Sequence, residues 1–510
     1  MNVSELSVRN LEQHGERDSL YFNGRWHTNR EMLDRSVRSA AGLAELGVQR
    51  GDRVATVLAN CPEVLNTFVA CFWMGAWCMP VMFSLSIEEM GYLFEDAQPT
   101  VVVTQSLFLD QVRAARTRAA SIKNIVTVDP EPVPDAVHMP SWFRQMPPDF
   151  PMAACSPDEV ALLMYTSGTT GNPKGVMISH DNLYFTADSS SRARGIEPGE
   201  TFLSCLPLNH SYGIILWASS EAFGLKNVLL PRFDCDELGR HIQQFRCSAT
   251  SLVPTMMVRL LNHPGLEQYD LSSLKRWGSA AAPLPLEVRR RFESRFPGTV
   301  IEAYGLTECS PTVAMNRMGE PWREGSVGRP IEGVTVSIQD ERGKILPPRL
   351  FGEICVRGRS VMQGYYRRPE ATAQVIREGW LHTGDAGHLD EDGFLYVTDR
   401  IKDLIIRGGE NIYPKDVEEV LLRHPGVLEA AVIGLPDPDY GEEVMAVIVP
   451  APGSALTEEE IVSFSRRRLG RFQVPKRVVF AESLPKTAIG KILKRELRQK
   501  FGPAGGKKSP

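Results

Sequence analysis

The chain has 510 residues, and its 57 Lys and Arg against 62 Asp and Glu give a formal net charge of −5. With 43% hydrophobic and 23% charged residues it has the composition of an ordinary globular protein, long enough for two or more domains. These values exclude a collagen-like or wholly disordered chain, and they argue against a general nucleic-acid polyelectrolyte, so we expect no nucleic-acid partner.

Helices and strands alternate in the first part of the chain. Residues 1–18 are polar and acidic, without the basic start and apolar core of a signal peptide. Apolar residues recur at helical spacing over 30–46, and a buried strand is predicted over 53–58. The alternation continues with helices near 64–74 and 87–95 and strands near 77–81, 100–104 and 124–128. It predicts a parallel sheet covered by helices.

Later segments change in character. The proline-rich segment 129–157 is predicted to be a surface connection, and a strand over 160–165 follows it. Short β-like runs between 334 and 395 predict a β-rich subdomain. Beyond 399 a compact α+β unit is predicted, with helices over 415–423 and 457–469 and strands over 428–433 and 444–449. The tail, 502–510, is rich in Gly, Pro and Lys and is expected to be disordered.

Three features bear on the compartment. The most apolar run, 68–83, is shorter than a bilayer span and contains Gly75 and Pro80, so we expect no transmembrane helix. The nine cysteines are scattered, with no CxxC pair and no His at metal-ligand spacing, which is typical of reduced thiols. The chain's last residues, KKSP, are not a peroxisomal signal. We therefore expect a cytoplasmic protein.

The most informative stretch is YTSGTTGNPKG, residues 165–175, which follows the predicted strand over 160–165. Its glycines allow tight turns, while its hydroxyls and one cation suit a polyphosphate. The spacing differs from that of a Walker P-loop. A flexible polar hairpin is the alternative, but the length and composition favour phosphate binding by Thr166, Ser167, Gly168, Thr169, Thr170, Gly171 and Lys174.

This stretch resembles the phosphate loop of the adenylate-forming superfamily of acyl-CoA synthetases, luciferases and adenylation domains. Eight further motifs occur in that superfamily's order: LPLNHSYG (206–213), GSAAAPL (278–284), YGLTE (304–308), GEICVRG (352–358), WLHTGD (380–385), DRIKD (399–403), GGENI (408–412) and PKTAIGK (485–491). The resemblance implies an α/β fold, with a large N-terminal domain of stacked α/β sheets, a β-rich subdomain and a small mobile α+β domain. It implies boundaries at 1–399 for the large domain, 400–402 for a hinge and 403–501 for the small domain.

The resemblance also implies a reaction. A carboxylate is a poor electrophile, so ATP activates it: the acid attacks the α-phosphate, pyrophosphate leaves, and CoA then attacks the acyl-adenylate. Such chemistry needs positioning and charge neutralisation. ATP, Mg²⁺ and coenzyme A are therefore expected, with Glu308 and Thr166 as Mg²⁺ ligands and Thr307 beside the α-phosphate. Read alone, Glu308 would be a surface carboxylate.

Further ATP contacts follow from the same resemblance. Asp385 can accept hydrogen bonds from the ribose hydroxyls, and Arg400 can reach the ribose or a phosphate. Tyr304 can stack on adenine, although a core tyrosine is the alternative. The remaining expected contacts are Ala281, Ala282, Pro283, Gly305 and Asn411.

The C-terminal part is expected to act in two ways. Lys491 is the residue expected to stabilise charge during adenylation, although it belongs to a basic stretch that is mostly solvated. Members of the superfamily swing the small domain, so Lys402 is expected at the hinge and Gly408 and Gly409 beside the CoA arm. A simple turn is the alternative for the two glycines.

The acyl pocket is the least determined part. His210 is expected to gate or orient the carboxylate, although a buried structural histidine is the alternative. Tyr212, Gly213, Trp217, Val253, Met256 and Ala280 are candidate pocket walls that could equally be core residues. Ala280 stands where many members have glycine, so its methyl group is expected to disfavour the longest acids. Arg259 could recognise a second carboxylate, but a surface arginine is the favoured interpretation.

The leading hypothesis is an acid–CoA ligase, with ATP, CoA and a medium-chain fatty, branched, alicyclic or aromatic monocarboxylate as its small-molecule partners. The alternatives left open are an acyl-AMP ligase that loads a carrier protein, a malonate-type dicarboxylate–CoA ligase, a peptide-synthetase adenylation domain and a luciferase-like oxygenase. A nucleotide-sensing pseudoenzyme ranks last because Lys491 and Glu308 are present. The sequence does not determine the oligomeric state, and a homodimer is one option.

Overall fold

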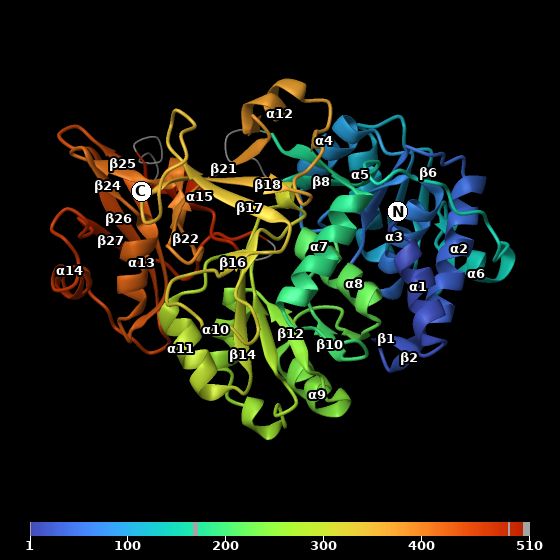
Figure 1. Cartoon of the computed structure of the whole chain (residues 1–510), viewed down its shortest axis with the longest axis horizontal. Coiled ribbons are helices and arrows are strands. Elements are labelled where there is room, and N and C mark those ends of the chain that lie inside the picture. Colours follow the sequence, from blue (N-terminus) through green and yellow to red (C-terminus); the bar gives the residue numbers. More distant parts are fainter. Residues whose placement is uncertain (1, 167–171, 488–489, 503–510) are drawn as a thin grey trace.

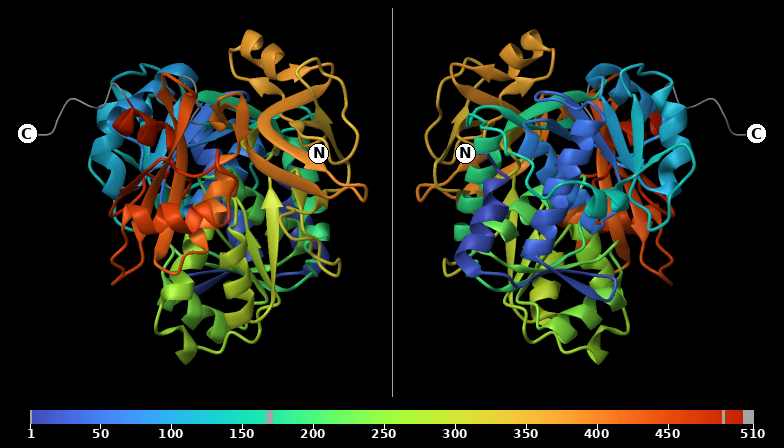
Figure 2. Two further views of the ribbon diagram at one scale, coloured as in Figure 1. Left: turned by 90° about the vertical axis from the view of Figure 1, so that its left-hand side faces the viewer. Right: turned by 90° about the vertical axis from the view of Figure 1, so that its right-hand side faces the viewer.

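The fold is described from a computed structural model that covers residues 2–166, 172–487 and 490–502. A large α/β domain and a small C-terminal domain lie side by side (Figure 1). Figure 2 shows the small domain, coloured from orange to red, in front of the large domain in one view and behind it in the other.

Two extended sheets form the large domain. One has nine strands in the order β16 (Arg329–Pro330), β15 (Ala314–Met315), β14 (Thr299–Tyr304), β13 (Arg276–Ser279), β12 (Ala249–Leu252), β10 (Thr201–Ser204), β11 (Lys226–Leu229), β1 (Asp18–Phe22) and β2 (Arg25–Thr28). The other has eight, in the order β19 (Gly364–Tyr365), β9 (Lys174–Ser179), β8 (Val160–Thr166), β4 (Trp77–Pro80), β3 (Arg53–Val57), β5 (Val101–Thr104), β6 (Asn124–Thr127) and β7 (Val137–His138).

Helices cover both sheets on both faces. Side chains alternate along each strand, so Val54 of β3 belongs to the central core while Ala55 and Val57 pack outwards. The central core also contains α1 (Glu5–His14), α2 (Asn29–Glu45), α3 (Pro62–Met74), α7 (His180–Ala193) and α8 (Ser211–Phe223). The outer faces carry α4 (Ile87–Ala97) and α5 (Leu109–Arg116) on one sheet, and α9 (Cys235–Phe245), α10 (Pro254–Asn262) and α11 (Leu286–Arg295) on the other.

Helix α8 lies in the middle of this stack. Its first ten residues, 211–220, are all buried, as expected for a helix that is apolar on every side. Helix α7 packs beside α8 (Figure 1). The two helices therefore separate the sheets and are available to line any site between them.

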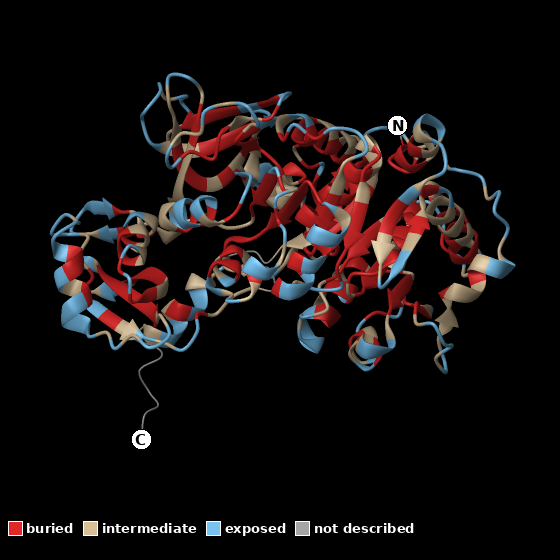
Figure 3. Cartoon of the chain, turned by 90° about the horizontal axis from the view of Figure 1, so that it is seen from below, coloured by how far each residue is buried: buried red, intermediate tan, exposed pale blue. Residues whose placement is uncertain are grey.

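The β-rich subdomain and the small domain each contain a five-stranded sheet. The subdomain has β17 (Val334–Gln339), β18 (Gly352–Gly358), β20 (Ile376–Arg377), β21 (Trp380–Leu389) and β22 (Leu395–Arg400), with α12 (Pro369–Val375) nearby. The small domain has β23 (Ile405–Arg407), β24 (Glu410–Ile412), β25 (Val427–Asp437), β26 (Gly441–Pro450) and β27 (Arg477–Phe480), packed with α13 (Pro414–Leu422), α14 (Glu458–Arg466) and α15 (Lys494–Phe501). Figure 3 shows buried residues filling the interior of both domains.

The segment 129–157 differs from its prediction as a surface connection. It contains β7 and α6 (Met139–Gln145), and both Met139 and Trp142 are buried. The Trp142 ring packs directly against Gly42 of α2, where a Cβ atom would collide with it. The prolines at both ends of the segment hide the sequence signal of a short helix. This helix is held in place by the packing of the Trp142 ring.

The thiols and the helices agree with the sequence analysis. All nine cysteines are free, and eight of them are buried. Over the described parts of the chain, no helix combines the length and apolar character that a membrane crossing requires. The tail residues 503–510 lie outside the described residues.

Candidate active site

Strands β8 and β9 form a hairpin whose loop carries the phosphate-binding prediction. Thr166 ends β8 and pairs with Lys174 at the start of β9, so the hydroxyl and the ammonium stand at the two ends of the loop. Five of the predicted residues, Ser167, Gly168, Thr169, Thr170 and Gly171, lie outside the described residues.

Glu308 lies beside this hairpin, in a short 3₁₀ turn, Thr307–Cys309, that follows β14. The Tyr365 hydroxyl donates to Oε1 of Glu308 at 2.9 Å, and the Lys174 ammonium lies 5.0 Å from the centre of the Tyr365 ring. Burial, followed by the Glu308 charge, raises the pKa of Tyr365, so the phenol keeps its proton and orients the carboxylate. The structure thus brings Lys174 and Glu308 together through Tyr365.

These donors fit a magnesium ion. Glu308 is partly buried with Oε2 turned away from Tyr365, and Thr166 offers a partly buried hydroxyl at the mouth of the loop. Hard oxygen donors of this kind are those that Mg²⁺ prefers, usually with water and phosphate oxygens completing its shell.

Asp385 joins Tyr304 to Arg400. The Tyr304 hydroxyl donates to Oδ2 of Asp385 at 2.7 Å, and Nε of Arg400 lies 3.0 Å from Oδ1. Burial raises the pKa of Tyr304 and Asp385 adds to the effect, so the phenol remains a donor. Three predicted ATP contacts are therefore joined by one hydrogen bond and one ion pair, from the ends of β14 and β22 and the middle of β21.

The two loops predicted to line the adenine have constrained backbones. Ala281 adopts φ +71°, a left-handed conformation that is uncommon for any residue but glycine. It turns the chain after β13, so that Ala282 is partly buried and Pro283 is exposed. At Gly305 a Cβ atom would collide with the Pro311 carbonyl, so the chain after Tyr304 packs as it does only with glycine.

The loop that carries Lys491 reaches the large domain. A Cβ atom on Gly490 would lie 2.5 Å from Oγ1 of Thr255, so this loop is in contact with the start of α10. Lys491 lies close enough to Arg400, Asp385 and Glu308 for their charges to act on its pKa. Crowding by the surrounding protein and then Arg400 lower that pKa, whereas the acidic neighbours oppose the change, and the Lys491 residue remains exposed to solvent.

Other predicted residues of the small domain lie elsewhere. Gly408, Gly409 and Asn411 are exposed on the β23–β24 hairpin, where the Gly408 N–H donates to the Tyr440 carbonyl at 2.8 Å. The assignments of Asn411 to the ATP site and of the two glycines to the CoA arm stay predictions. Lys402 is exposed in the connection between β22 and β23.

His210 caps the N-terminus of α8. Its Nδ1 accepts the Tyr212 N–H at 3.2 Å, and burial lowers its pKa to about 4. The ring is therefore neutral at pH 7, and its single proton is on Nε2, which leaves one donor for a ligand. The next residue, Ser211, brings its hydroxyl oxygen within 3.5 Å of that of Thr307, so α8 begins next to the Glu308 turn.

The remaining acyl candidates gather at the ends of β12 and β13. Ala280 and Val253 are buried, and Met256 is partly buried in the first turn of α10. Gly213 is required by packing, because a Cβ atom there would strike the Pro207 carbonyl. Arg259 is exposed, with its guanidinium 5.1 Å from the centre of the Phe233 ring, as the surface interpretation predicts.

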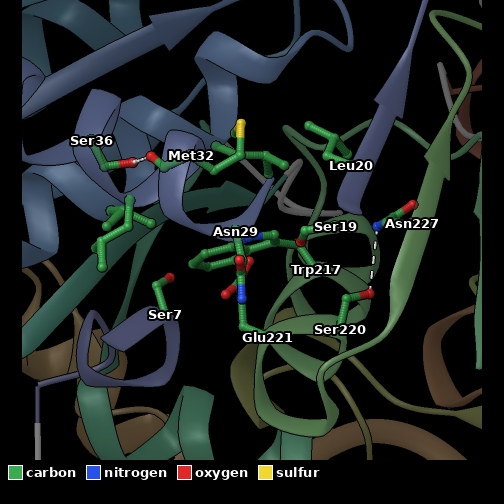
Figure 4. Close-up of a pocket in the computed structure, with 13 residues that line it drawn as sticks. Ser7, Ser19, Leu20, Asn29, Met32, Ser36, Trp217, Ser220, Glu221 and Asn227 are labelled. Carbon is green, nitrogen blue, oxygen red and sulfur yellow. Dashed lines mark hydrogen bonds between the residues drawn. The ribbon is translucent and has the colours of Figure 1, made fainter. Parts of the chain in front are cut away.

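Trp217 belongs to a different cavity. A small polar cavity between α1, α2, α8, β1 and β11 is lined by Trp217, Glu221, Asn29, Asn227 and several serines (Figure 4). The Trp217 ring packs against Phe68 and Phe72 of α3, with ring centres 5.9 and 6.2 Å away. Trp217 is therefore a core residue bordering this cavity.

Two relationships escaped the sequence analysis. Tyr365 orients Glu308 although 57 positions separate them, and the aromatic pair Tyr365–Tyr366 was the one local signal. No histidine stands at metal-ligand spacing from a cysteine in the sequence, but the fold brings one such pair together. Cys355 on β18 lies 3.3 Å from Nδ1 of His382 on the adjacent β21, with Glu353 completing a small cluster.

Comparison with known proteins gives consistent matches along the chain. The AMP-binding enzyme family matches residues 8–366, and the AMP-binding enzyme C-terminal domain matches residues 416–491. A long-chain-fatty-acid–CoA ligase of Bacillus subtilis is 36% identical over 94% of this chain and 91% of that protein. A feruloyl-CoA synthase of Amycolatopsis is 38% identical over 93% and 94%. The crystal structure of ATP-bound MatB from Rhodopseudomonas palustris superposes with a TM-score of 0.91 at 30% identity, covering 99% of this chain and all of that one.

Proposed function

The chain belongs to the AMP-binding enzyme family and is an ATP-dependent carboxylic acid–CoA ligase, and we propose that the group around Glu308, Asp385 and Lys491 activates a compact carboxylic acid. The enzyme converts acid and ATP into acyl-AMP and pyrophosphate, and then acyl-AMP and CoA into acyl-CoA and AMP. It uses Mg²⁺ in the first step. The observation that carries the proposal is the contact of the C-terminal loop with the large domain, which brings Lys491 to the ATP residues.

Lys491 supplies positive charge in the first half-reaction. The carboxylate and the triphosphate are both anionic, so their approach is unfavourable until a cation lies between them. An ammonium held beside the reacting oxygens stabilises the charge that develops there, with no reorganisation during the reaction. Lys174 acts on the phosphates from the opposite side, at the end of the β8–β9 loop.

Glu308 and Thr166 would hold the magnesium ion, which neutralises phosphate charge. Tyr365 fixes the Glu308 carboxylate, and Thr307 follows β14 at the α-phosphate position. Asp385 receives the ribose hydroxyls: its Oδ2 accepts the Tyr304 hydroxyl, and the remaining lone pairs of the carboxylate are left for a ligand. Arg400 forms an ion pair with this carboxylate.

The acid lies between α8 and β13, with its carboxylate at the His210 ring. The Nε2 proton of His210 is free to donate to a carboxylate oxygen. Tyr212 and Ser251 fill the space in front of Gly278, where the Tyr212 hydroxyl would lie 3.0 Å from a Cβ atom. With Ala280 at the entrance, this pocket favours aromatic, alicyclic, branched or medium-chain acids over the longest fatty acids.

The second half-reaction requires the small domain to turn. Gly408 and Gly409 have φ of +59° and +87° and are exposed next to the apolar side chains of Ile406 and Tyr440. Rotation about Lys402 would bring this apolar face over the acyl-adenylate and remove Lys491 from it. On this basis we place the hinge at 400–402, between domains of residues 1–399 and 403–501.

We also propose a cytoplasmic location, which is supported by nine free cysteines in the structure. A homodimer stays a prediction, and light scattering coupled to size-exclusion chromatography checks it.

Pyrophosphate release with ATP and Mg²⁺ across a panel of carboxylic acids, with and without CoA, tests the proposal. We expect release with compact acids and multiple turnovers when CoA is present. Acid-dependent release that ignores CoA would instead favour an acyl-AMP ligase that loads a carrier protein. Preference for the longest fatty acids would contradict the proposed pocket.

A further inference from the structure

Arg194 is a buried cation whose terminal nitrogens have no hydrogen-bond partner among the described residues. It follows the last turn of α7, its residue is 5% exposed, and within the described part of the chain neither terminal guanidinium nitrogen makes a hydrogen bond. Buried arginines are normally paired, because an isolated charge away from water is costly. Such an unpaired side chain indicates that the Arg194 guanidinium pairs with a ligand that is not part of the folded chain.

Three hydroxyl groups on α7 share this condition. Thr186, Ser190 and Ser191 are fully buried, and none of their hydroxyl oxygens has a hydrogen-bond partner among the described residues. Thr186, Ser190 and Arg194 are spaced four residues apart, so they lie on one face of the helix. Native proteins contain few unsatisfied buried polar groups, and a run of them on one face indicates a polar ligand.

This face adjoins the acyl pocket. The Arg194 guanidinium carbon lies 6.0 Å from the centre of the Tyr212 ring, and α7 packs against α8 (Figure 1). The Tyr212 hydroxyl in turn lies next to Gly278 of β13. Arg194 therefore lies beyond Tyr212, on the side of the pocket away from Ala280.

The length of the proposed acyl pocket runs along strand β13. Arg276 and Gly278 are two residues apart and face the same side as α8, while Ala280 follows the end of the strand. At a rise of about 3.3 Å per residue, Ala280 and Arg276 are about 13 Å apart. The acid is placed along this side of β13, with one end at His210 and the other toward Arg194.

In the described part of the chain, no carboxylate forms an ion pair with Arg194. Glu200 is committed to Arg276, whose guanidinium donates to its Oε2, and Oε1 of Glu200 has no partner among the described residues. Arg276 is itself a cation, so its charge adds to burial in lowering the pKa of Arg194. The electrostatic complement of this end of the pocket is an anion.

We propose that Arg194 binds a second anionic group at the distal end of the acid, so that the preferred substrates are dicarboxylic acids. This inference rests on the proposed function and names the substrate class of its acyl site. The guanidinium takes the distal carboxylate in a two-pronged hydrogen bond, with the Ser190 and Thr186 hydroxyls as further donors. The first carboxylate stays at His210 for adenylation.

Matched acids and variants test the proposal. Pyrophosphate release is measured with hexanedioate, heptanedioate and octanedioate against hexanoate, heptanoate and octanoate, for wild type, Arg194→Met, Arg194→Lys and Arg192→Met. Arg192 is a matched control, because it is a surface residue two positions away and pairs with Asp188. We expect wild type to favour a dicarboxylate at least about tenfold over the monocarboxylate of equal length, as sites that bond a substrate group discriminate strongly against its absence.

The variants should separate recognition from folding. Arg194→Met should lower kcat/KM for the dicarboxylate about 100-fold while leaving the monocarboxylate within about threefold, and Arg194→Lys should recover part of the loss. Arg192→Met should behave as wild type. Because the substitution removes an unpaired buried charge, Arg194→Met should also raise the Tm of the ligand-free protein, whereas the dicarboxylate should raise the Tm of wild type only.

Three results would overturn the inference. One is a wild-type preference for monocarboxylates. Another is an equal loss for both acids in Arg194→Met together with a lowered Tm, which assigns the arginine to folding. The third, no activation of any acid by wild type, would remove the proposed function itself and this inference with it, and it is recognised by the absence of pyrophosphate release in every arm.

Discussion

Nε of Arg400 lies 3.0 Å from Oδ1 of Asp385, and the two residues are direct cross-strand partners on β22 and β21. Arg400 is the last residue of β22, so the chain leaves the large domain for the small one from a residue that is paired with Asp385. If Asp385 binds the ribose as proposed, this pair connects nucleotide binding to the proposed hinge.

Asp385→Asn should weaken ATP binding. The amide retains one acceptor oxygen but presents an NH₂ group to a neighbouring donor, and it no longer pairs with the Arg400 charge. We expect KM for ATP to rise at least about tenfold, since breaking a buried pair leaves the other charge unpaired. Tyr304→Phe, which removes one hydrogen bond and no charge, is the control and should show a smaller rise. Equal effects would show that the charge pair is not what matters.

Lys491→Ala should separate the half-reactions. Adenylation is expected to fall about 100-fold or more, the scale for removal of one charge-stabilising donor. Thioester formation from supplied acyl-AMP and CoA should stay within about threefold of wild type, because that step uses the other face of the small domain. Lys486→Ala is a matched control in the same loop, since its ammonium pairs with Glu429 inside the small domain. Equal loss of both half-reactions in Lys491→Ala would refute the division of labour.

Ala280→Gly should shift acid preference toward longer or bulkier acids. Ala280 is 9% exposed just after β13, and in the proposed pocket its methyl group would narrow the acyl entrance. Removing one methyl group changes discrimination by about 1–3 kcal/mol, or roughly tenfold to 200-fold. The ranking of a panel by kcat/KM checks this, and an unchanged ranking would show that Ala280 does not line the pocket.

Protonation of His210 should lower the free energy of unfolding at acidic pH. Its pKa is about 4 in the folded protein against about 6.5 in an unfolded chain, so the unfolded state binds more protons between these values. The stabilisation is present above pH 6.5 and is lost as the pH falls towards 4. Between pH 7 and pH 4.5 the free energy of unfolding should fall by about 2–3 kcal/mol more in wild type than in His210→Gln. Denaturant titrations measure this, and parallel losses in both proteins would exclude His210 as the cause.

Much of the fold could be predicted because its signals are local. Helix α2 occupies Asn29–Glu45 where helical spacing predicts 30–46, and β3 occupies Arg53–Val57 within the predicted 53–58. Helix α6 was missed because its stability depends on Trp142 packing against Gly42, a contact across about a hundred residues. Pairing of distant segments leaves little trace in a single sequence.

The residues of the candidate site also fall into two groups: those that sequence motifs identify and those that only the structure reveals. Motifs identified Asp385, Arg400 and Tyr304, and the structure joins them by one hydrogen bond and one ion pair. Tyr365 and Arg194 could not be found from the sequence, since their importance lies in which group they face and, for Arg194, in which partner is missing among the described residues. Asn411, Gly408 and Gly409 lie on the exposed β23–β24 hairpin, and their roles stay predictions.

The most direct test of the account follows an oxygen atom. The enzyme is given ATP, Mg²⁺, CoA and a substrate acid labelled with ¹⁸O in its carboxylate, and the products are analysed by mass spectrometry. Because the carboxylate oxygen attacks the α-phosphorus and stays on phosphorus when the thiol displaces AMP, one ¹⁸O atom per turnover should appear in AMP, in step with acyl-CoA. Unlabelled AMP, or label in inorganic phosphate together with ADP, would contradict the acyl-adenylate route.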